Sequence, residues 1–170
     1  YGTLDNLADK VTIQLNDTHP ALAVPELMRI LMDENGYNWY NAWNIVTKTF
    51  AYTNHTVLQE ALEKWPVAYI QKLLPRIYLI IEEIDNQWTN QLRQMGKSEE
   101  MINSMRIISE GNVKMAFLSI VGSYSVNGVA KLHTQILKAD TFKNFYEINP
   151  AKFNNKTNGV TQRRWFFYSN

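Results

Sequence analysis

The chain has 170 residues, of which 45% are hydrophobic and 19% are charged, and its net charge is +1. This composition is ordinary for a globular chain with one core, and the weak, interspersed charge gives no field that would recruit nucleic acid. Cysteine is absent, which excludes disulfides and thiolate metal sites. No apolar run approaches the ~20 residues that a membrane span needs, so neither nucleic acid nor a membrane is expected as a partner.

The first third of the chain predicts a unit of strand, two helices and strand. Residues 11–15 form a β-branched, apolar run that is typical of a buried strand. One helix is expected to begin near Pro25 and to end at Gly36, a second to cover about 39–47, and a second strand to cover 49–53. If both strands share a sheet, they should be parallel neighbours joined by a right-handed crossover.

The middle of the chain predicts mainly helices. Apolar residues at helical spacing predict one helix over 67–74 and another from Pro75 to a break at Gly96. Ser98 is expected to cap the next helix, because the first turn after it is acidic.

The last third predicts a helix over about 113–121, a strand-like piece at 124–126 and a helix over 129–137. Short helices and turns are expected over 140–170. The whole pattern therefore predicts a helix-rich α/β chain with a few buried strands.

Polar side chains follow both strands that are expected to pair. Asp17 and His19 come after the first strand, and His55 and Thr56 come after the second. Ligands of open parallel sheets bind outside the carboxyl ends of the strands. This mixture of donors and acceptors suits a polyhydroxylated ligand, although each cluster taken alone is also typical of a turn or a helix cap.

Two later segments could approach a ligand as well. The glycine in residues 123–129 would let backbone N–H groups come close to it, although a tight strand-to-helix turn is the simpler interpretation. Residues 156–161 contain an Asn-Gly turn signal. Arg163 and Arg164 follow, and they could bind a phosphate or carboxylate, lie exposed, or form an internal ion pair.

Other chemistries find little support in the sequence. The three histidines have no metal-ligand spacing, and His133 is interpreted as a helix-surface or satisfied core residue. No serine lies in a nucleophile-elbow context. Asp17, Glu60 and Glu63 are candidates by type for a glycosidase pair, but Glu60 and Glu63 more simply solvate a helix face.

The two ends of the chain are typical of a segment cut from a longer protein. Residues 1–6 contain no initiator Met and no signal pattern. The aromatic cluster at 165–170 indicates either a missing partner surface or a terminus docked on its own core.

Four runs together resemble the α-glucan (glycogen or starch) phosphorylases: residues 13–22, 48–58, 126–133 and 155–161. Their order and spacing match as well. The likeness covers nearly the whole chain and weakens between about 75 and 107.

The resemblance implies a fold and a reaction. Such enzymes have two Rossmann-like domains of the GT-B type with the active site between them, and they are usually cytoplasmic homodimers. They use inorganic phosphate to release the terminal α-1,4-linked glucose of a glucan as glucose 1-phosphate, with retained configuration. Their cofactor is pyridoxal phosphate, whose phosphate group takes part in proton transfer. Residues 1–170 would form a single segment of the N-terminal glucan-binding domain, and the C-terminal domain with the cofactor-linking lysine would lie outside this chain.

The resemblance also implies roles for particular residues. His55 and Asn158 would hydrogen-bond the hydroxyls of the glucosyl unit in the catalytic pocket. Thr56 and Val129 would line the same pocket. The remainder of the phosphorylase chain, the glucan and inorganic phosphate are the implied partners.

Asp17 and His19 would lie in the adjoining channel that holds the glucan chain. The sequence departs from the family pattern at three positions: Gln59 and Gln162 stand where proline is usual, and Tyr124 replaces a histidine. Tyr124 is expected to alter packing next to the cofactor region.

Two other classes of function stay open on the sequence alone. The chain could be a non-catalytic remnant or scaffold that binds a glucan weakly. It could also belong to a nucleotide-sugar glycosyltransferase of similar architecture, which would need a nucleotide-binding half that this sequence does not show.

Overall fold

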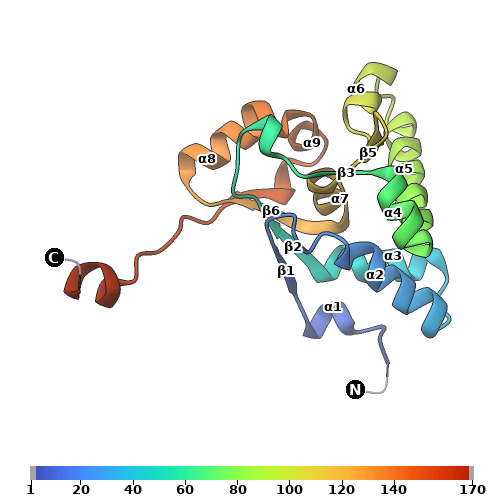
Figure 1. Cartoon of the computed structure of the whole chain (residues 1–170), viewed down its shortest axis with the longest axis horizontal. Coiled ribbons are helices and arrows are strands. Elements are labelled where there is room, and N and C mark those ends of the chain that lie inside the picture. The colour runs from blue at the N-terminus through green and yellow to red at the C-terminus, as the bar shows by residue number, and fades with distance from the viewer. Residues whose placement is uncertain (1–2, 169–170) are drawn as a thin grey trace.

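A four-stranded parallel sheet lies at the centre of the computed structural model, which describes residues 3–168. Its strands follow the order β1-β2-β6-β7, and every neighbouring pair is parallel (Figure 1). The strands are β1 (Ile13–Asn16), β2 (Phe50–Thr53), β6 (Ser123–Gly128) and β7 (Phe153–Asn155). The prediction of a helix-rich α/β, partial Rossmann-like domain with a few parallel strands is confirmed.

The predicted order of strand, helices and strand is confirmed, with β1 and β2 as parallel neighbours. The expectation of a buried first strand was wrong: β1 lies at the edge of the sheet, and of its residues only Leu15 is buried. A short helix precedes β1, and the chain between β1 and β2 has a loop over 17–22, then helices interrupted by a turn in which Gly36 has a φ of 71°. Asn38 begins the second helix, because its side chain accepts a hydrogen bond from the backbone N–H of Asn41 at 2.9 Å. The helices are α1 (Leu7–Lys10), α2 (Ala23–Arg29), the π-helical turn η1 (Ile30–Glu34) and α3 (Trp39–Thr49).

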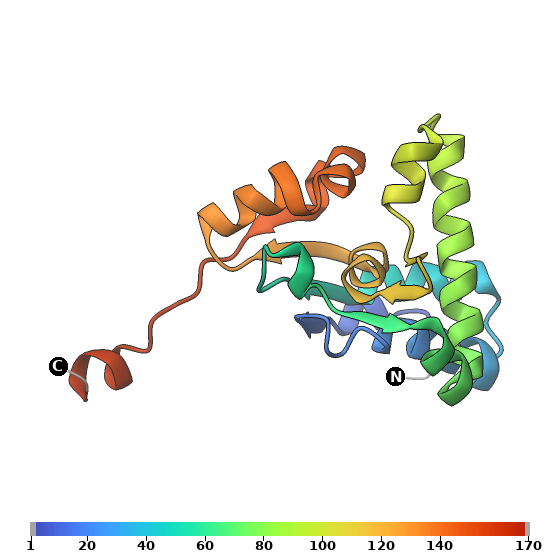
Figure 2. The same cartoon turned by 45° about the horizontal axis from the view of Figure 1, so that its top comes forward.

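The predicted helices of the middle region are confirmed as α4 (Val67–Leu73), α5 (Pro75–Gln94) and α6 (Glu99–Ser104). The long helix α5 stands at one side of the molecule with α6 beside it (Figure 2). The Ser98 side chain caps α6 by accepting a hydrogen bond from the backbone N–H of Met101 at 3.2 Å.

A second, antiparallel sheet was not predicted. It has the order β3-β5-β4, with β3 (Lys64–Pro66), β4 (Ile108–Ser109) and β5 (Asn112–Lys114). Because β5 takes residues up to 114, the helix expected from 113 begins at Met115 as α7 (Met115–Gly122). Strands of two or three residues carry too little hydrophobic alternation to be recognised from sequence.

The C-terminal third contains a strand where only short helices and turns were expected. β7 pairs with β6, so that Phe153 lies opposite Val126, and this pairing rather than any local pattern defines it. The elements around β7 are α8 (Lys131–Ile136), η3 (Leu137–Thr141), α9 (Lys143–Ile148), the 3₁₀ turn η4 (Pro150–Lys152) and η5 (Arg163–Phe167).

The segment after β7 runs away from the sheet in both cartoon views (Figure 1, Figure 2). Phe167 and Tyr168 are 80% and 83% exposed, so these two rings do not dock on the chain's own core. The side chains of Trp165 and Phe166 and residues 169–170, which belong to the same predicted cluster, lie outside the described residues.

One hydrophobic core holds the sheet and the helices together. Leu15, Phe50, Tyr52 and Val126 contribute fully buried side chains from the strands, and buried residues of α2, α3, α5 and α7 belong to the same core. Burial of such side chains supplies the main driving force for folding. No helix within residues 3–168 has both the length and the apolar character to cross a membrane.

Candidate functional site

The register of the parallel sheet places a row of polar residues at its carboxyl edge. Asn16 lies opposite Thr53, Thr53 opposite Asn127, and Asn127 opposite Asn154. Each strand then continues into a loop at the same edge. The row and the four following loops, residues 16–20, 53–57, 127–130 and 154–158, are termed the polar edge.

Hydrogen bonds join this row across the strands. The Thr53 hydroxyl donates to Asn127 Oδ1 at 2.8 Å and accepts from Gln14 Nε2 at 2.8 Å. The loops are joined as well, because the Asn54 N–H donates to the Asn127 carbonyl and the Asp17 N–H to the Thr53 carbonyl, both at 2.9 Å. The polar edge is therefore one connected structure whose parts come from distant segments of the sequence.

His55 is oriented by the strand next to its own. Its Nε2 lies 2.6 Å from Asn16 Oδ1. Because an amide oxygen only accepts hydrogen bonds, Nε2 carries the proton, and Nδ1 of the neutral ring is then an acceptor. The exposed imidazole can therefore accept a hydrogen bond from a ligand hydroxyl while Asn16 holds its orientation.

Asn54 supports the turn that presents His55 and Thr56. Its fully buried side chain donates to the Tyr52 hydroxyl at 2.9 Å and accepts from the Thr56 N–H at 3.0 Å. Burial raises the pKa of Tyr52, and its hydroxyl stays protonated at neutral pH. Asn54 is thus a structural member of the polar edge that was not singled out from the sequence.

The loop after β1 begins with a left-handed residue. Asp17 has a φ of 60°, which aspartate tolerates better than most residues because its short side chain can hydrogen-bond locally. Its Oδ1 accepts the Thr18 N–H at 2.7 Å. This turn leaves the side chain of His19 81% exposed at the polar edge.

Val129 and His133 meet at the end of β6. The Val129 N–H donates to His133 Nδ1 at 3.0 Å, so the neutral ring carries its proton on Nε2. Burial lowers the pKa of His133, the backbone of Thr56 opposes this shift, and the positive charge that His55 can carry adds to it. The interpretation of His133 as a helix-surface or satisfied core residue holds in part. The residue is half-buried on α8 and its Nδ1 accepts a hydrogen bond, whereas its buried Nε2 has no hydrogen-bond partner of good geometry.

Gly128 explains how α8 packs so closely on β6. A Cβ atom at this position would lie 2.5 Å from Thr134 Oγ1 and 2.7 Å from His133 Nδ1. Only glycine leaves room for this contact. The tight strand-to-helix turn, which was the simpler interpretation of residues 123–129, is therefore supported.

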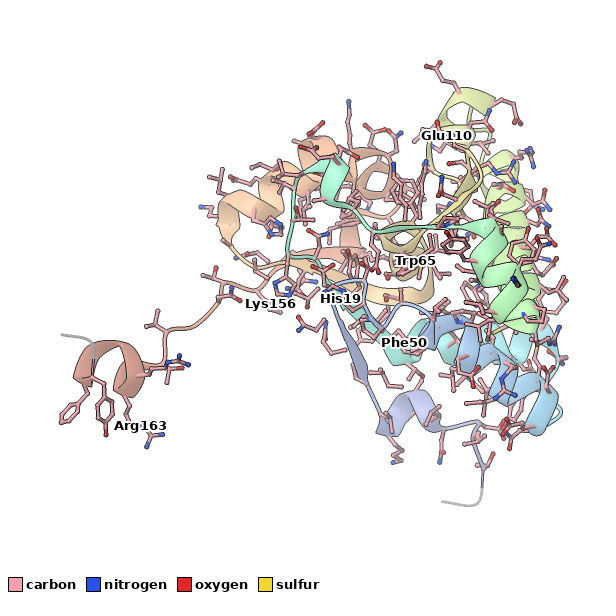
Figure 3. The ribbon with its side chains drawn as sticks, viewed as in Figure 1. His19, Phe50, Trp65, Glu110, Lys156 and Arg163 are labelled. Carbon is pink, nitrogen blue, oxygen red and sulfur yellow. The ribbon has the colours of Figure 1, made fainter. Side chains whose placement is uncertain are left out.

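Asn158 reaches the polar edge from β7. Its N–H donates to the Val129 carbonyl at 3.0 Å, and the Lys156 N–H donates to the Gly128 carbonyl at 3.1 Å. Figure 3 shows His19 and Lys156 on this side of the molecule and Arg163 far from them on the C-terminal helix. The structure thus brings all six predicted site residues to one edge of the sheet: Asp17, His19, His55, Thr56, Val129 and Asn158.

Glu60 and Glu63, grouped together in the sequence, have different environments. Glu60 is exposed on the 3₁₀ turn η2 (Gln59–Ala61). Glu63 lies after that turn and does not solvate a helix face, because its carboxylate accepts hydrogen bonds from Thr18 and from the Trp65 indole. That part of the interpretation was wrong for Glu63.

Several members of the polar edge were missed in the sequence. Asn16, Asn127 and Asn154 occupy the aligned row, yet each looks like an ordinary turn residue on its own. The available signal was an Asn or Thr at the last or next-to-last position of each parallel strand, and it becomes visible only when all four strands are known.

Two of the departures from the phosphorylase pattern have simple surroundings. The Tyr124 hydroxyl lies 3.3 Å from Thr12 Oγ1, and the ring is 46% exposed. Gln59 Nε2 makes a long contact of 3.5 Å to the Thr141 carbonyl. Neither residue contacts the side chains of the aligned polar row through a hydrogen bond.

The open parallel sheet with its surrounding helices places the chain in the Rossmann-like class of α/β domains, and a row of uncharged hydrogen-bonding groups lies at the carboxyl edge, where such sheets bind ligands. The sequence model of the carbohydrate phosphorylase family matches residues 1–170. The chain belongs to this family.

Individual relatives agree with the family match. The glycogen phosphorylase of Bacillus subtilis is 53% identical over 171 residues, which cover 100% of this chain and 21% of that protein. The muscle form of glycogen phosphorylase from Ovis aries is 53% identical, and the brain form from Rattus norvegicus is 51% identical, each over 98% of this chain and 20% of the relative. The chain therefore spans about a fifth of the length of these relatives.

Proposed function

We propose that this chain is an internal segment of the N-terminal, glucan-binding domain of an α-glucan phosphorylase. The polar edge would form part of the wall that holds the terminal α-1,4-linked glucosyl unit while inorganic phosphate displaces it as glucose 1-phosphate. The observation that carries the proposal is the convergence of six residues, chosen from sequence, on one connected sheet edge in a chain of the carbohydrate phosphorylase family. We assign hydrogen bonding of the glucosyl hydroxyls to His55 and Asn158.

The chemistry of the polar edge suits a sugar. A glucosyl unit presents several hydroxyls, each of which can donate and accept, and the edge offers imidazole, amide and backbone groups of both kinds. Cleavage of the glycosidic bond develops positive charge at the sugar ring, and groups already oriented toward it need no rearrangement as that charge appears. The bond from His55 to Asn16 provides such an orientation.

The cofactor implied by the family would supply a phosphate group for proton transfer, and the residues of this chain do not fit its attachment. Lys152 is the lysine whose pKa burial lowers to about 8, but its Nζ donates to the Ile120 carbonyl at 2.8 Å and lies away from the polar edge. Lys156 lies at the edge and is exposed. We therefore assign pyridoxal phosphate and its lysine to the C-terminal domain of the parent protein.

The remaining parts of the proposal concern the parent protein. It would act as a cytoplasmic homodimer with an α-glucan and inorganic phosphate as substrates. The isolated chain spans about a fifth of its relatives, so we propose that it has no phosphorolytic activity alone and binds a glucan at most weakly.

The test uses the full-length parent protein. Replacing His55 or Asn158 with alanine should lower kcat/KM for phosphorolysis by about 5- to 150-fold, which corresponds to loss of one hydroxyl contact of about 1–3 kcal/mol. Asn44→Ala, an exposed position on α3, serves as the matched control and should leave kcat/KM unchanged. An unchanged kcat/KM in His55→Ala would refute the assigned role.

A further inference from the structure

The side chain of Glu63 joins two segments of the chain by hydrogen bonds to Thr18, which is 45 residues away in sequence, and to Trp65. These three residues are termed the clasp. One carboxylate oxygen, Oε2, accepts a short hydrogen bond from the hydroxyl of Thr18. The other oxygen, Oε1, accepts the indole N–H of Trp65 at 2.9 Å. His19 Nδ1 lies 4.0 Å from Oε2, so the carboxylate also faces the exposed imidazole of the β1 loop.

The backbone of Glu63 is itself fixed. Its carbonyl accepts the N–H of Met115 at the start of α7 at 3.1 Å. Lys64, the next residue, begins β3 and pairs with Lys114 of β5. The side chain of Glu63 therefore reaches from the small antiparallel sheet to the polar edge of the parallel sheet.

The partner of Glu63 in the β1 loop is buried. Thr18 is only 2% exposed, and the backbone on either side of it carries Asp17 and His19. A buried hydroxyl that loses its acceptor carries a desolvation cost, so the contact with Glu63 favours one conformation of this loop. Asp17, in the same loop, is in the left-handed region.

We propose that Glu63 is a positioning residue, which holds the Asp17–His19 loop at the polar edge through Thr18 and thereby fixes the direction in which His19 faces a glucan. The inference rests on the proposed function only for the identity of the ligand. The clasp itself involves no ligand contact and is defined by Glu63, Thr18 and Trp65.

Two variants of Glu63 test whether the clasp depends on the shape of this side chain or on its negative charge. Glu63→Gln keeps the shape of the side chain and can keep both contacts: its Oε1 can accept from the Trp65 indole, and its Nε2 can donate to the Thr18 hydroxyl, which then accepts instead of donating. Glu63→Ala removes both contacts. Glu60→Ala is the matched control, since Glu60 is an exposed carboxylate three residues away with no role in the clasp.

The experiment uses the 170-residue chain, ¹⁵N-labelled, with amide and indole resonances assigned. In Glu63→Ala, the indole N–H signal of Trp65 and the amide signals of Thr18 and His19 should move, whereas Glu60→Ala leaves them in place. Glu63→Gln should keep the amide signals near their wild-type positions. Thr18→Val should move the Trp65 indole signal much less than Glu63→Ala, because Trp65 binds the other oxygen.

A second arm measures the ligand. In the full-length parent protein, titration calorimetry with maltoheptaose should show binding by the wild type and by Glu63→Gln, and Glu63→Ala should weaken the apparent affinity by about 5- to 30-fold. Unmoved loop signals in Glu63→Ala would overturn the clasp. Moved loop signals with an unchanged maltoheptaose affinity would overturn the positioning role.

The two arms also distinguish failure of the inference from failure of the proposed function. If maltoheptaose does not bind the wild-type parent protein, the glucan assignment fails, and the positioning of His19 toward a glucan is rejected with it. The signals of Thr18 and Trp65 still decide whether the clasp exists. If Glu63→Ala loses all dispersed signals, the variant has not folded, and Thr18→Val then tests the clasp. If the clasp holds the loop, Thr18→Val moves the amide signals of Asp17 and His19; unmoved signals would overturn the clasp.

Discussion

Replacing Asn54 with alanine should destabilise the fold and loosen the turn that presents His55. The side chain is fully buried and makes two hydrogen bonds, one to the Tyr52 hydroxyl at 2.9 Å and one from the Thr56 N–H at 3.0 Å. Each such bond contributes about 0.5–1.5 kcal/mol net, and a buried group left without a partner costs about 1–3 kcal/mol. Because Tyr52 is fully buried and its hydroxyl would lose this bond, we expect a loss of about 2–4 kcal/mol in the free energy of unfolding.

The assay is urea unfolding followed by far-UV circular dichroism, with thermal unfolding as a second measure. A loss of this size in a chain of 170 residues corresponds to a fall in Tm of roughly 4–16 °C. Asn44→Ala is the control: the residue is exposed in α3, and alanine has the higher helix propensity, so its stability should stay within about 0.5 kcal/mol of the wild type or rise slightly.

A loss below about 1 kcal/mol in Asn54→Ala would refute the reasoning. It would mean that the Tyr52 hydroxyl and the Thr56 N–H find other partners without cost, and that the turn before His55 does not depend on Asn54.

Three further predictions concern Asp85, Gly128 and His133. Asp85 is 1% exposed and accepts hydrogen bonds from Arg106 at 2.8 Å and from a backbone N–H at 2.7 Å, so Asp85→Ala should lower the free energy of unfolding by about 2–4 kcal/mol in urea. Gly128→Ala should cost about 1–3 kcal/mol by overpacking against α8, whereas Gly159→Ala, with open space around it, should cost less than half as much in the same assay. The lowered pKa of His133 means that the unfolded chain binds its proton more readily, so this residue's contribution to stability is complete above pH 6.5 and is lost as the pH falls through its folded-state pKa. The urea midpoint should therefore fall less steeply below pH 6.5 in His133→Gln than in the wild type; equal slopes would contradict the role of His133.

The helices and the first parallel pair of strands could be predicted because their signals are local. A left-handed glycine ends the first helical segment at Gly36, and Ser98 caps α6 through the N–H of Met101, three residues further along the chain. Apolar residues recur in α5 at the spacing that buries one face of a helix. Such patterns depend on residues a few positions apart, so the sequence displays them directly.

The candidate site could be predicted only in part. Asp17 and His55 stand out because polar clusters follow two recognisable strands. His133 and Glu63 do not, because their positions depend on contacts with residues that are distant in sequence or on another element. His133 accepts a hydrogen bond from the Val129 N–H, and Glu63 accepts one from the Thr18 hydroxyl. The sequence around the histidine or the glutamate indicates neither partner.

By itself the sequence determined the helical segments, the β1–β2 pair and the polar character of the residues that follow each strand. Only the tertiary structure decided that β7 joins the sheet, that Asn16, Thr53 and Asn127 align in one row, and that a second sheet anchors Glu63. The physical reason is the range of the interactions. Helix periodicity and caps are set within one or two turns of chain, whereas the pairing of three-residue strands is stabilised by partners tens of residues away, which a single sequence does not reveal.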